Sequence, residues 1–427
     1  MKVARRLTFN DIALFCIFSL YPILPMYFRI GPAMIYYFLL LPCVASVVLL
    51  KKKIHLYKEY KMYIPYILIM FFLFAVHVEV IEAAKFVLAP IFITIFLLDY
   101  VDSKGKFDRA IDILLFFCAI MCFLGLLEGL KDINLFKLLN NSNATIKEDG
   151  VRMGLYRTKL SFNMSTNYGN YLVVMISLVL YRLSNMGLTL KRKILYIGLD
   201  LLIIANAVCA GARATLIVTL LLQFVYIYKF GTGKFFKIVL GGLIAAALGF
   251  LGCEIIGIDL FKYVKSYFYV FLSLFSDKFQ KGIEVEFGTN LTMSTDRVNL
   301  YSWVLKAVKG HIVFGMGEAS AFKYEVNQWR TKTSLENYYL SSIYHYGIVG
   351  LVGTVYRFLV PILFSLKRIK TKVANEKIGF NFFFFTTCCA YCLVLFTVSL
   401  LSDARIFSLF VILMLIYNIR IKKGETD

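Results

Sequence analysis

Five arginines stand in polar segments beside long apolar runs, and they are the residues of this chain best suited to bind an anion. They are Arg152, Arg157, Arg213, Arg297 and Arg405. A guanidinium group offers a planar fork of donors that matches phosphate oxygens bidentately, and it keeps its charge near lipid. Two or three such groups could hold a diphosphate without a metal ion. Each arginine taken singly could instead serve in an ion pair or against a lipid headgroup.

The residue types that usually hold catalytic metals are scattered along the chain. The four histidines, His55, His77, His311 and His345, lack ligand spacing with one another, and there is no DxD pair of aspartates. Zinc and similar ions need three or four such ligands gathered at one point. We therefore expect neither a metal nor a cofactor.

Glu336 is the first candidate for a general base, because it stands where a long apolar run begins. A carboxylate at a helix N-terminus is stabilised by the helix dipole, which alone could explain its presence. In the functional interpretation it takes a proton from a sugar hydroxyl at the membrane face. Asn337 and Tyr338 beside it could hydrogen-bond and stack on a sugar ring. His311 and His345 are the alternative bases.

The elements that must position these residues are membrane helices. The chain has 427 residues, of which 60% are hydrophobic, and its mean hydropathy is +0.74. Soluble domains are about 45–50% apolar, whereas runs of about 20 apolar residues are what a bilayer requires. Twelve spans are expected, at 9–27, 32–50, 63–78, 81–98, 111–129, 166–183, 194–210, 213–230, 235–256, 337–364, 379–401 and 404–420. The expected fold is therefore all-α, a single polytopic integral membrane domain over residues 1–427.

The basic residues indicate how these spans are oriented. More than half of the 47 lysines and arginines lie at the termini or in alternate short loops. Short cytoplasmic loops are enriched in Lys and Arg, so both termini are predicted to be cytoplasmic. A smaller loop at 130–165 and a large loop at 257–336 are then extracytoplasmic. The net charge of +21 is explained by this asymmetry, and nucleic acid is not an expected partner.

Four local patterns resemble the O-antigen ligase and polymerase family of bacterial polysaccharide assembly. They are RMGLYRTKLSFNMSTNYGNYL, AGARATLIVTLL, DRVNLYSWVLKAVKGHIVFGMG and ENYYLSSIYHYGIVGLVG, and the resemblance is best over residues 150–353. Family members are polytopic, with a large extracytoplasmic loop late in the chain that contains short helices, a GT-C-like arrangement. The resemblance implies a metal-independent glycosyltransferase of the bacterial cytoplasmic membrane. Its substrate would be a polyprenyl-diphosphate-linked oligosaccharide of an O-antigen, capsule or exopolysaccharide pathway.

The resemblance also implies roles for individual residues. Arg213 and Arg297 correspond to arginines that engage the diphosphate, and Arg152 and Arg157 are weaker counterparts. Glu336 stands where ligases typically have histidine, which favours a polymerase that extends the non-reducing end of an acceptor unit. A chain-length regulator and a flippase are the protein partners that such a pathway would add to the lipid bilayer and the lipid-linked substrate.

Three other functions fit the same composition. A ligase would attach finished glycan to lipid or protein. A polysaccharide transporter or flippase would also carry charges within its spans, although such proteins usually show an internal two-fold repeat that this sequence lacks. A non-catalytic scaffold of an assembly complex is the third alternative.

Overall fold

The structure is a computed structural model dominated by one bundle of helices. It describes residues 8–25, 27–31, 33–49, 61, 64–77, 80–140, 151–152, 155–230, 265, 292–317, 320–327, 330–333, 335, 337–369, 372–373, 375–397 and 405–422. The long elements of the bundle are α1 (Phe9–Ser19), α3 (Leu41–Leu49), α5 (Ile64–His77), α6 (Val80–Tyr100), α7 (Lys104–Lys131), α8 (Ser165–Ser184), α9 (Leu190–Cys209), α10 (Arg213–Phe230), α15 (Tyr338–Arg368), α16 (Phe380–Val394) and α17 (Arg405–Ile416).

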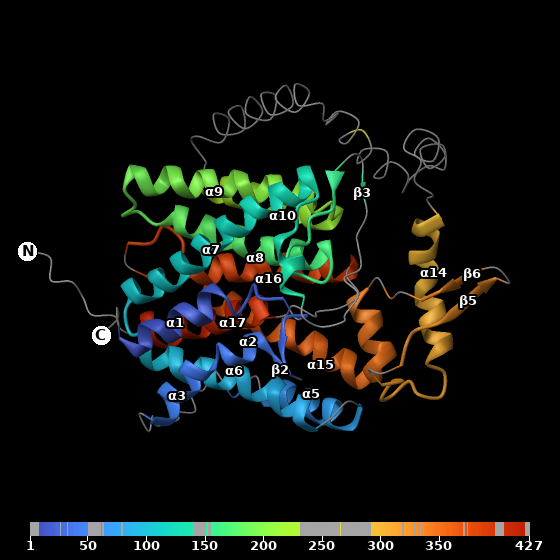
Figure 1. Ribbon diagram of the computed structural model, residues 1–427. Helices are drawn as coiled ribbons and strands as arrows, with labels where there is room; N and C mark the ends of the chain where they lie inside the picture. Colours follow the sequence, from blue (N-terminus) through green and yellow to red (C-terminus); the bar gives the residue numbers. More distant parts are fainter. Residues whose placement is uncertain are drawn as a thin grey trace, which may run out of the picture.

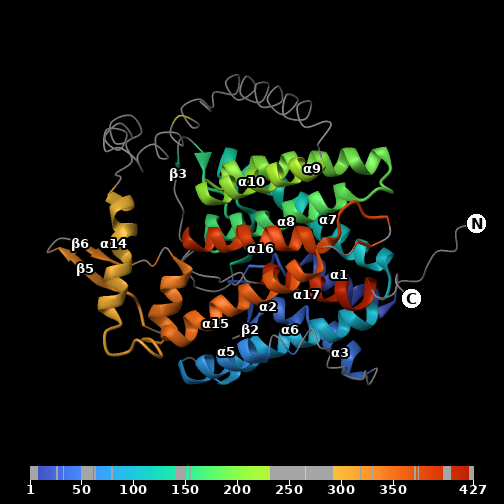
Figure 2. The same cartoon turned by 180° about the vertical axis from the view of Figure 1, so that it is seen from behind.

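The bundle has two distinct ends. One end, which we call the terminal end, contains the start of α1 and the π-helical turn η3 (Tyr417–Ile421) near the end of the described chain (Figure 1). The opposite end, the hairpin end, carries α14 (Thr292–Ala307) and short antiparallel strand pairs, and the view from behind agrees (Figure 2). The paired strands are β1 (Arg29–Ile30) with β2 (Ala33–Met34), β3 (Val151–Arg152) with β4 (Leu155–Tyr156), and β5 (Tyr324–Asn327) with β6 (Arg330–Lys332). The remaining short helices are α2 (Ile35–Phe38), η1 (Leu135–Leu139) and η2 (Leu395–Thr397).

The expectation of a mostly helical membrane protein is confirmed, whereas the three hairpins were not predicted. Among the described residues, three helical stretches are long and apolar enough to cross a membrane: α7, α15, and α16 continued through η2 to Thr397. The count of twelve spans and the orientation of the termini stay predictions. The expected span at 235–256 and most of the large loop at 257–336 lie outside the described residues.

Helix α8 is the centre of the bundle. Nearly all of its residues are buried, and α7, α9, α10, α16 and α17 pack around it. Its neighbour α10 approaches closely at Gly169, where an added Cβ would lie 2.2 Å from Thr215 Oγ1. Small residues at such a contact let two backbones come together and add packing energy where lipid supplies no hydrophobic driving force.

Ionic and tyrosine contacts join the helices at the terminal end. The Glu376 side chain is 1% exposed; it pairs with Lys104 and accepts hydrogen bonds from the hydroxyls of Tyr181 (2.6 Å) and Tyr417 (2.8 Å). Alongside, Arg182 Nε lies 2.9 Å from Asp112 Oδ1, which also accepts a bond from Tyr196. A buried charge is tolerated only when it is paired and hydrogen-bonded, and these contacts meet that requirement.

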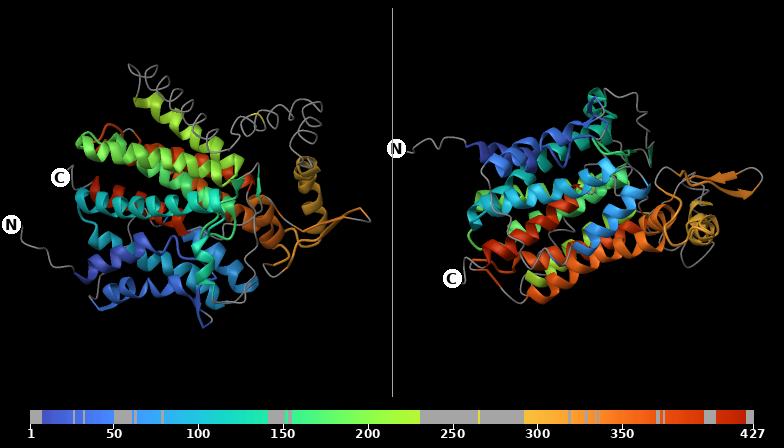
Figure 3. Two further views of the ribbon diagram at one scale, coloured as in Figure 1. Left: turned by 45° about the horizontal axis from the view of Figure 1, so that its top comes forward. Right: turned by 90° about the horizontal axis from the view of Figure 1, so that it is seen from below.

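Helix α15, which covers the span expected at 337–364, contains a break that was not predicted. Gly347 has φ 69° and ψ −162°, so the backbone leaves the helical conformation there. Loop residues 311–317, which follow α14, pack against this break. Figure 3 shows α14 and the β5–β6 hairpin projecting beyond the bundle at this end.

Candidate functional site at the hairpin end

The segment that carries Arg157 is held by a buried carboxylate, that of Glu128 in α7. Glu128 Oε2 accepts the backbone N–H groups of Lys159 (3.1 Å) and Leu160 (2.7 Å). Its Oε1 accepts a bond from Asn134 Nδ2 at 2.7 Å, and the same amide nitrogen donates to the Leu160 carbonyl. Leu160 has φ 52°, a left-handed conformation that a leucine rarely adopts unless its surroundings impose it. Glu128 therefore fixes the path of the chain just after Arg157.

The same segment touches the turn that leads to Arg213. The Thr158 N–H donates to the Cys209 carbonyl (3.1 Å) at the end of α9. The turn then passes through Gly211, which has φ 60°, and α10 begins at Arg213. The structure thus brings together two of the four sequence patterns, the one with Arg157 and the one with Arg213. The backbones of Arg152, Arg213 and Arg297 are described, but their side chains lie outside the described part of the structure.

Arg157 itself is half-buried, and its Nε is a buried donor. Among the described residues, no hydrogen-bond acceptor contacts this atom. Leaving such a donor unpaired costs about 1–3 kcal/mol, more when the group is charged, so a buried Nε of this kind is expected to take a partner. An anionic oxygen is the partner that a guanidinium nitrogen would take.

A second group of candidates lies where α14 meets the start of α15. Arg297 stands one helical turn before Tyr301 in α14, and the Tyr301 hydroxyl accepts a bond from Asn337 Nδ2 at 3.3 Å. Asn337 caps α15, because its Oδ1 accepts the N–H groups of Tyr339 (2.9 Å) and Leu340 (3.1 Å). Both ends of this amide are therefore engaged in fixing α15 against α14. Glu336, the residue before it, lies outside the described residues.

The remaining candidates differ in how they are placed. Tyr338 is half-buried and its ring packs against Tyr339, which itself donates to the Cys392 carbonyl. His345 Nδ1 lies 3.0 Å from the Gly317 carbonyl, and His311 is exposed in the loop after α14. These three residues keep their predicted roles as proposals only.

Arg405, by contrast, is buried, with 8% of its surface exposed. Its Nη1 donates to the Tyr21 carbonyl (2.8 Å), and its guanidinium lies 4.3 Å from the centre of the Tyr36 ring. These contacts tie the start of α17 to the segment after α1. These contacts give Arg405 a structural role, and its contact with substrate stays a prediction.

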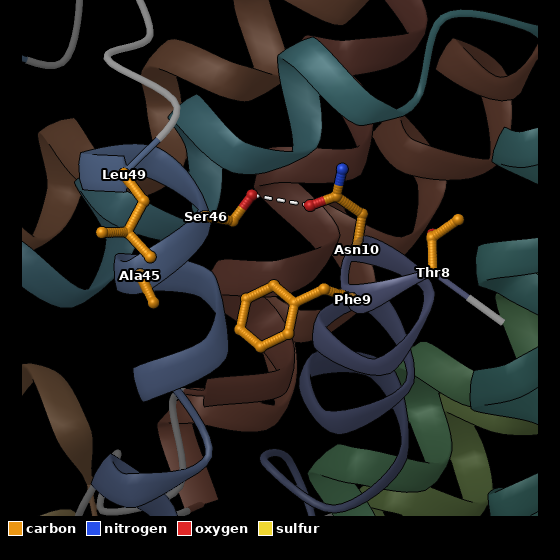
Figure 4. Close-up of a pocket in the computed structure, with 6 residues that line it drawn as sticks. All are labelled: Thr8, Phe9, Asn10, Ala45, Ser46 and Leu49. Carbon is orange, nitrogen blue, oxygen red and sulfur yellow. Dashed lines mark hydrogen bonds between the residues drawn. The ribbon is translucent and has the colours of Figure 1, made fainter.

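Neither a metal cluster nor the pocket between α1 and α3 adds to this site. Within the described ranges, no group of three or more His, Cys, Asp or Glu side chains is arranged to hold a metal ion. A pocket of about 270 Å³ lies between α1 and α3, where Asn10 and Ser46 hydrogen-bond at 2.7 Å (Figure 4). Its six lining side chains are uncharged: Thr8, Phe9, Asn10, Ala45, Ser46 and Leu49. Nothing in that lining would recognise a diphosphate.

The part of the chain that contains the Arg213 turn and α14 is similar to a known protein family. Residues 198–355 match the O-antigen ligase family. The match begins in α9, includes the Arg213 turn and α14, and ends within α15, so the resemblance to the O-antigen ligase/polymerase family is confirmed over this stretch. Members of this family are membrane-embedded glycan transferases. No curated protein sequence matches the chain.

Sequence reasoning missed Glu128. Glu128 lies in the run FLGLLEGLKD at the end of α7, where it is a single acidic residue within an apolar stretch. The available signal was that an ionisable residue inside an apolar helix is costly and therefore usually has a specific partner. Its partners are backbone N–H groups about thirty positions away, which no local pattern indicates.

Proposed function

We propose that the chain is a polymerase of lipid-linked oligosaccharide repeat units. The observation that carries the proposal is the bond between Thr158 and Cys209, which joins the Arg157 segment to the Arg213 turn within or beside the matched family region. Two guanidinium groups from these segments, with Arg297 from α14, would surround one anionic headgroup. Arg152 in β3 would add a fourth.

In the proposed reaction the donor is a glycan on a polyprenyl diphosphate. Arg213 and Arg297 hold the diphosphate, helped by Arg152 or Arg157, while Glu336 takes the proton from an acceptor hydroxyl. The acceptor oxygen attacks the anomeric carbon and the bond to the diphosphate oxygen breaks, so that polyprenyl diphosphate leaves with the added negative charge. Arginines aimed at that charge stabilise the transition state without a metal ion. His311 and His345 are the alternative bases.

The decisive experiment is elongation of a purified lipid-diphosphate repeat unit by the purified protein, with and without a chelator. We expect a ladder of polymer that the chelator does not alter. Arg213→Ala and Arg297→Ala should abolish it, and Arg213→Lys should restore little, because an ammonium group lacks the bidentate fork. Arg192→Ala is the matched control, since Arg192 is exposed near the start of α9, at the terminal end. Polymer of normal length from both alanine variants would refute the proposal.

A ligase is the second candidate, and the family description itself favours it. The same assay separates the two, because a ligase transfers glycan to a different lipid or protein acceptor and leaves repeat units unextended. The position of Glu336, where ligases typically have histidine, is the reason to place the polymerase first. A flippase would move the lipid between leaflets of vesicles without forming any glycosidic bond.

A further inference from the structure

The loop of residues 311–317 completes the broken helix α15 by pairing with its backbone. The N–H groups of Met316 and Gly317 donate to the carbonyls of Tyr344 (2.8 Å) and His345 (3.0 Å). In the other direction, the N–H groups of Ile348 (2.9 Å) and Val349 (3.2 Å) donate to the carbonyls of Ile312 and Val313. The break at Gly347 would leave these helix groups without partners, and the loop satisfies them.

Two glycines make this contact possible. Gly347 has φ 69°, and a Cβ there would lie 2.2 Å from the Val313 carbonyl oxygen. Gly315 has φ 76°, and a Cβ there would lie 2.5 Å from the His345 carbonyl. Any side chain at either position would meet backbone atoms, which cannot move aside as a flexible side chain would. The pairing is therefore a built feature of the fold.

The tip of this loop presents large apolar side chains to the outside. Four of them, which we call the apolar tip, are exposed: Ile312 (42%), Val313 (50%), Phe314 (50%) and Met316 (37%). Such a concentration of exposed apolar side chains usually marks an interaction site. The centre of the Phe314 ring lies 6.4 Å from the centre of the Phe72 ring in α5, which is also exposed.

The apolar tip continues a stripe along α15 that faces away from the bundle. The exposed residues of that stripe recur every three or four positions, as one face of a helix requires: Ile348, Val352, Val355, Leu359, Leu363 and Leu366. Because α15 is one of the helices long and apolar enough to cross a membrane, acyl chains are the surroundings that suit this stripe. The apolar tip adjoins the first residue of this stripe, because the Ile348 N–H donates to the Ile312 carbonyl.

We propose that residues 312–316 insert into the hydrocarbon edge of the bilayer beside the kink of α15. Non-helical backbone enters hydrocarbon only if its peptide groups are satisfied, and the pairing with α15 supplies those bonds for the Ile312 and Val313 carbonyls and the Met316 N–H. Lys309 and His311, both exposed, precede the tip and stand where charged and polar groups meet lipid headgroups. The insertion would hold α14 against the membrane surface.

Fluorescence quenching by lipid tests this proposal on the full chain in vesicles. The two native tryptophans, Trp303 and Trp329, are first replaced by phenylalanine. Phe314→Trp, and separately Ile312→Trp, then report on the tip in phosphatidylcholine vesicles with or without bromine on the acyl chains. We expect both reporters to lose most of their emission to brominated lipid and to resist aqueous iodide. Lys323→Trp, at an exposed position just before β5, is the control and should show the reverse.

Two outcomes would overturn the proposal. Quenching of both tip reporters by iodide but not by brominated lipid would place the tip in water. Quenching by neither would mean that protein, such as a second copy of the chain, covers it. The measurement does not depend on catalysis, so its result is independent of the proposed polymerase activity.

Discussion

Replacement of Glu128 tests how the fold positions Arg157. In Glu128→Gln one carboxylate oxygen becomes an amide NH₂. If the remaining oxygen keeps the N–H groups of Lys159 and Leu160, the NH₂ faces Asn134 Nδ2, and two donors oppose each other. Asn134 cannot simply turn over, because its Oδ1 accepts the Phe136 N–H and its Nδ2 serves the Leu160 carbonyl. At least one buried donor therefore loses its acceptor.

The expected cost follows from that count. One unsatisfied buried donor costs about 1–3 kcal/mol, which corresponds to a roughly 5- to 150-fold increase in local opening of the segment. Hydrogen exchange of the peptide that contains Lys159 and Leu160 should accelerate by that factor in Glu128→Gln. In the elongation assay, the KM for the lipid donor should rise more than kcat falls, because Arg157 is displaced rather than removed.

The control for this experiment is Asp102→Asn, which removes an ion pair with Lys106 (2.9 Å) where the aspartate side chain is 56% exposed. Exposed pairs of this kind contribute about 0–1 kcal/mol, so exchange of the 157–163 segment should not change. If Glu128→Gln leaves the exchange of Lys159 and Leu160 at the wild-type rate, Glu128 does not hold the segment and the argument fails.

Two further substitutions test whether Glu376 and Arg405 stabilise the fold rather than take part in the proposed reaction. Glu376→Gln removes a buried carboxylate that accepts hydrogen bonds from Tyr181 and Tyr417 and pairs with Lys104. Because hydrogen bonds to a charged group contribute about 1.5–3 kcal/mol, and Lys104 keeps its pair with Asp108 (3.3 Å), we expect a loss of stability of about 2 kcal/mol, measured by thermal unfolding in detergent. An unchanged Tm would contradict this. Arg405→Lys should lower stability by about 1–2 kcal/mol through loss of the Tyr21 bond and the contact with the Tyr36 ring. The folded fraction of Arg405→Lys should still elongate the lipid-linked unit, and selective loss of activity would restore the predicted substrate contact.

Local pattern was sufficient to predict most of the helices. The expected spans at 166–183 and 213–230 match α8 and α10 closely, and the span at 111–129 lies within the longer α7, because long apolar runs leave the backbone no other way to satisfy its hydrogen bonds in lipid. The family resemblance also implied that the Arg157 and Arg213 segments serve one site, and the bond from Thr158 to Cys209 shows that these two segments touch.

Features that depend on contacts between residues far apart in the sequence could not be predicted from local pattern. The break at Gly347 could not be predicted from the apolar run, since a glycine there could equally serve helix packing. The break is stabilised by backbone bonds to residues 312–317, which are distant in the sequence. The amide of Asn337 caps α15 and contacts Tyr301, a role that the sequence did not indicate because it depends on the position of α14. The contact of Asn337 with a sugar stays a prediction.

The two ends of the bundle also bear on the choice between an enzyme and a transporter. At the terminal end, Glu376 is held by Lys104, Tyr181 and Tyr417, which come from three separate elements. An alternating-access transporter would have to break these buried bonds in every cycle to open that end, whereas a transferase that works at one face need never do so. At the hairpin end, Arg157 Nε is a buried donor for which the described residues supply no acceptor. The buried contacts at the terminal end therefore favour the proposed transferase, whose substrate would bind at the hairpin end alone, over a transporter that must open both ends.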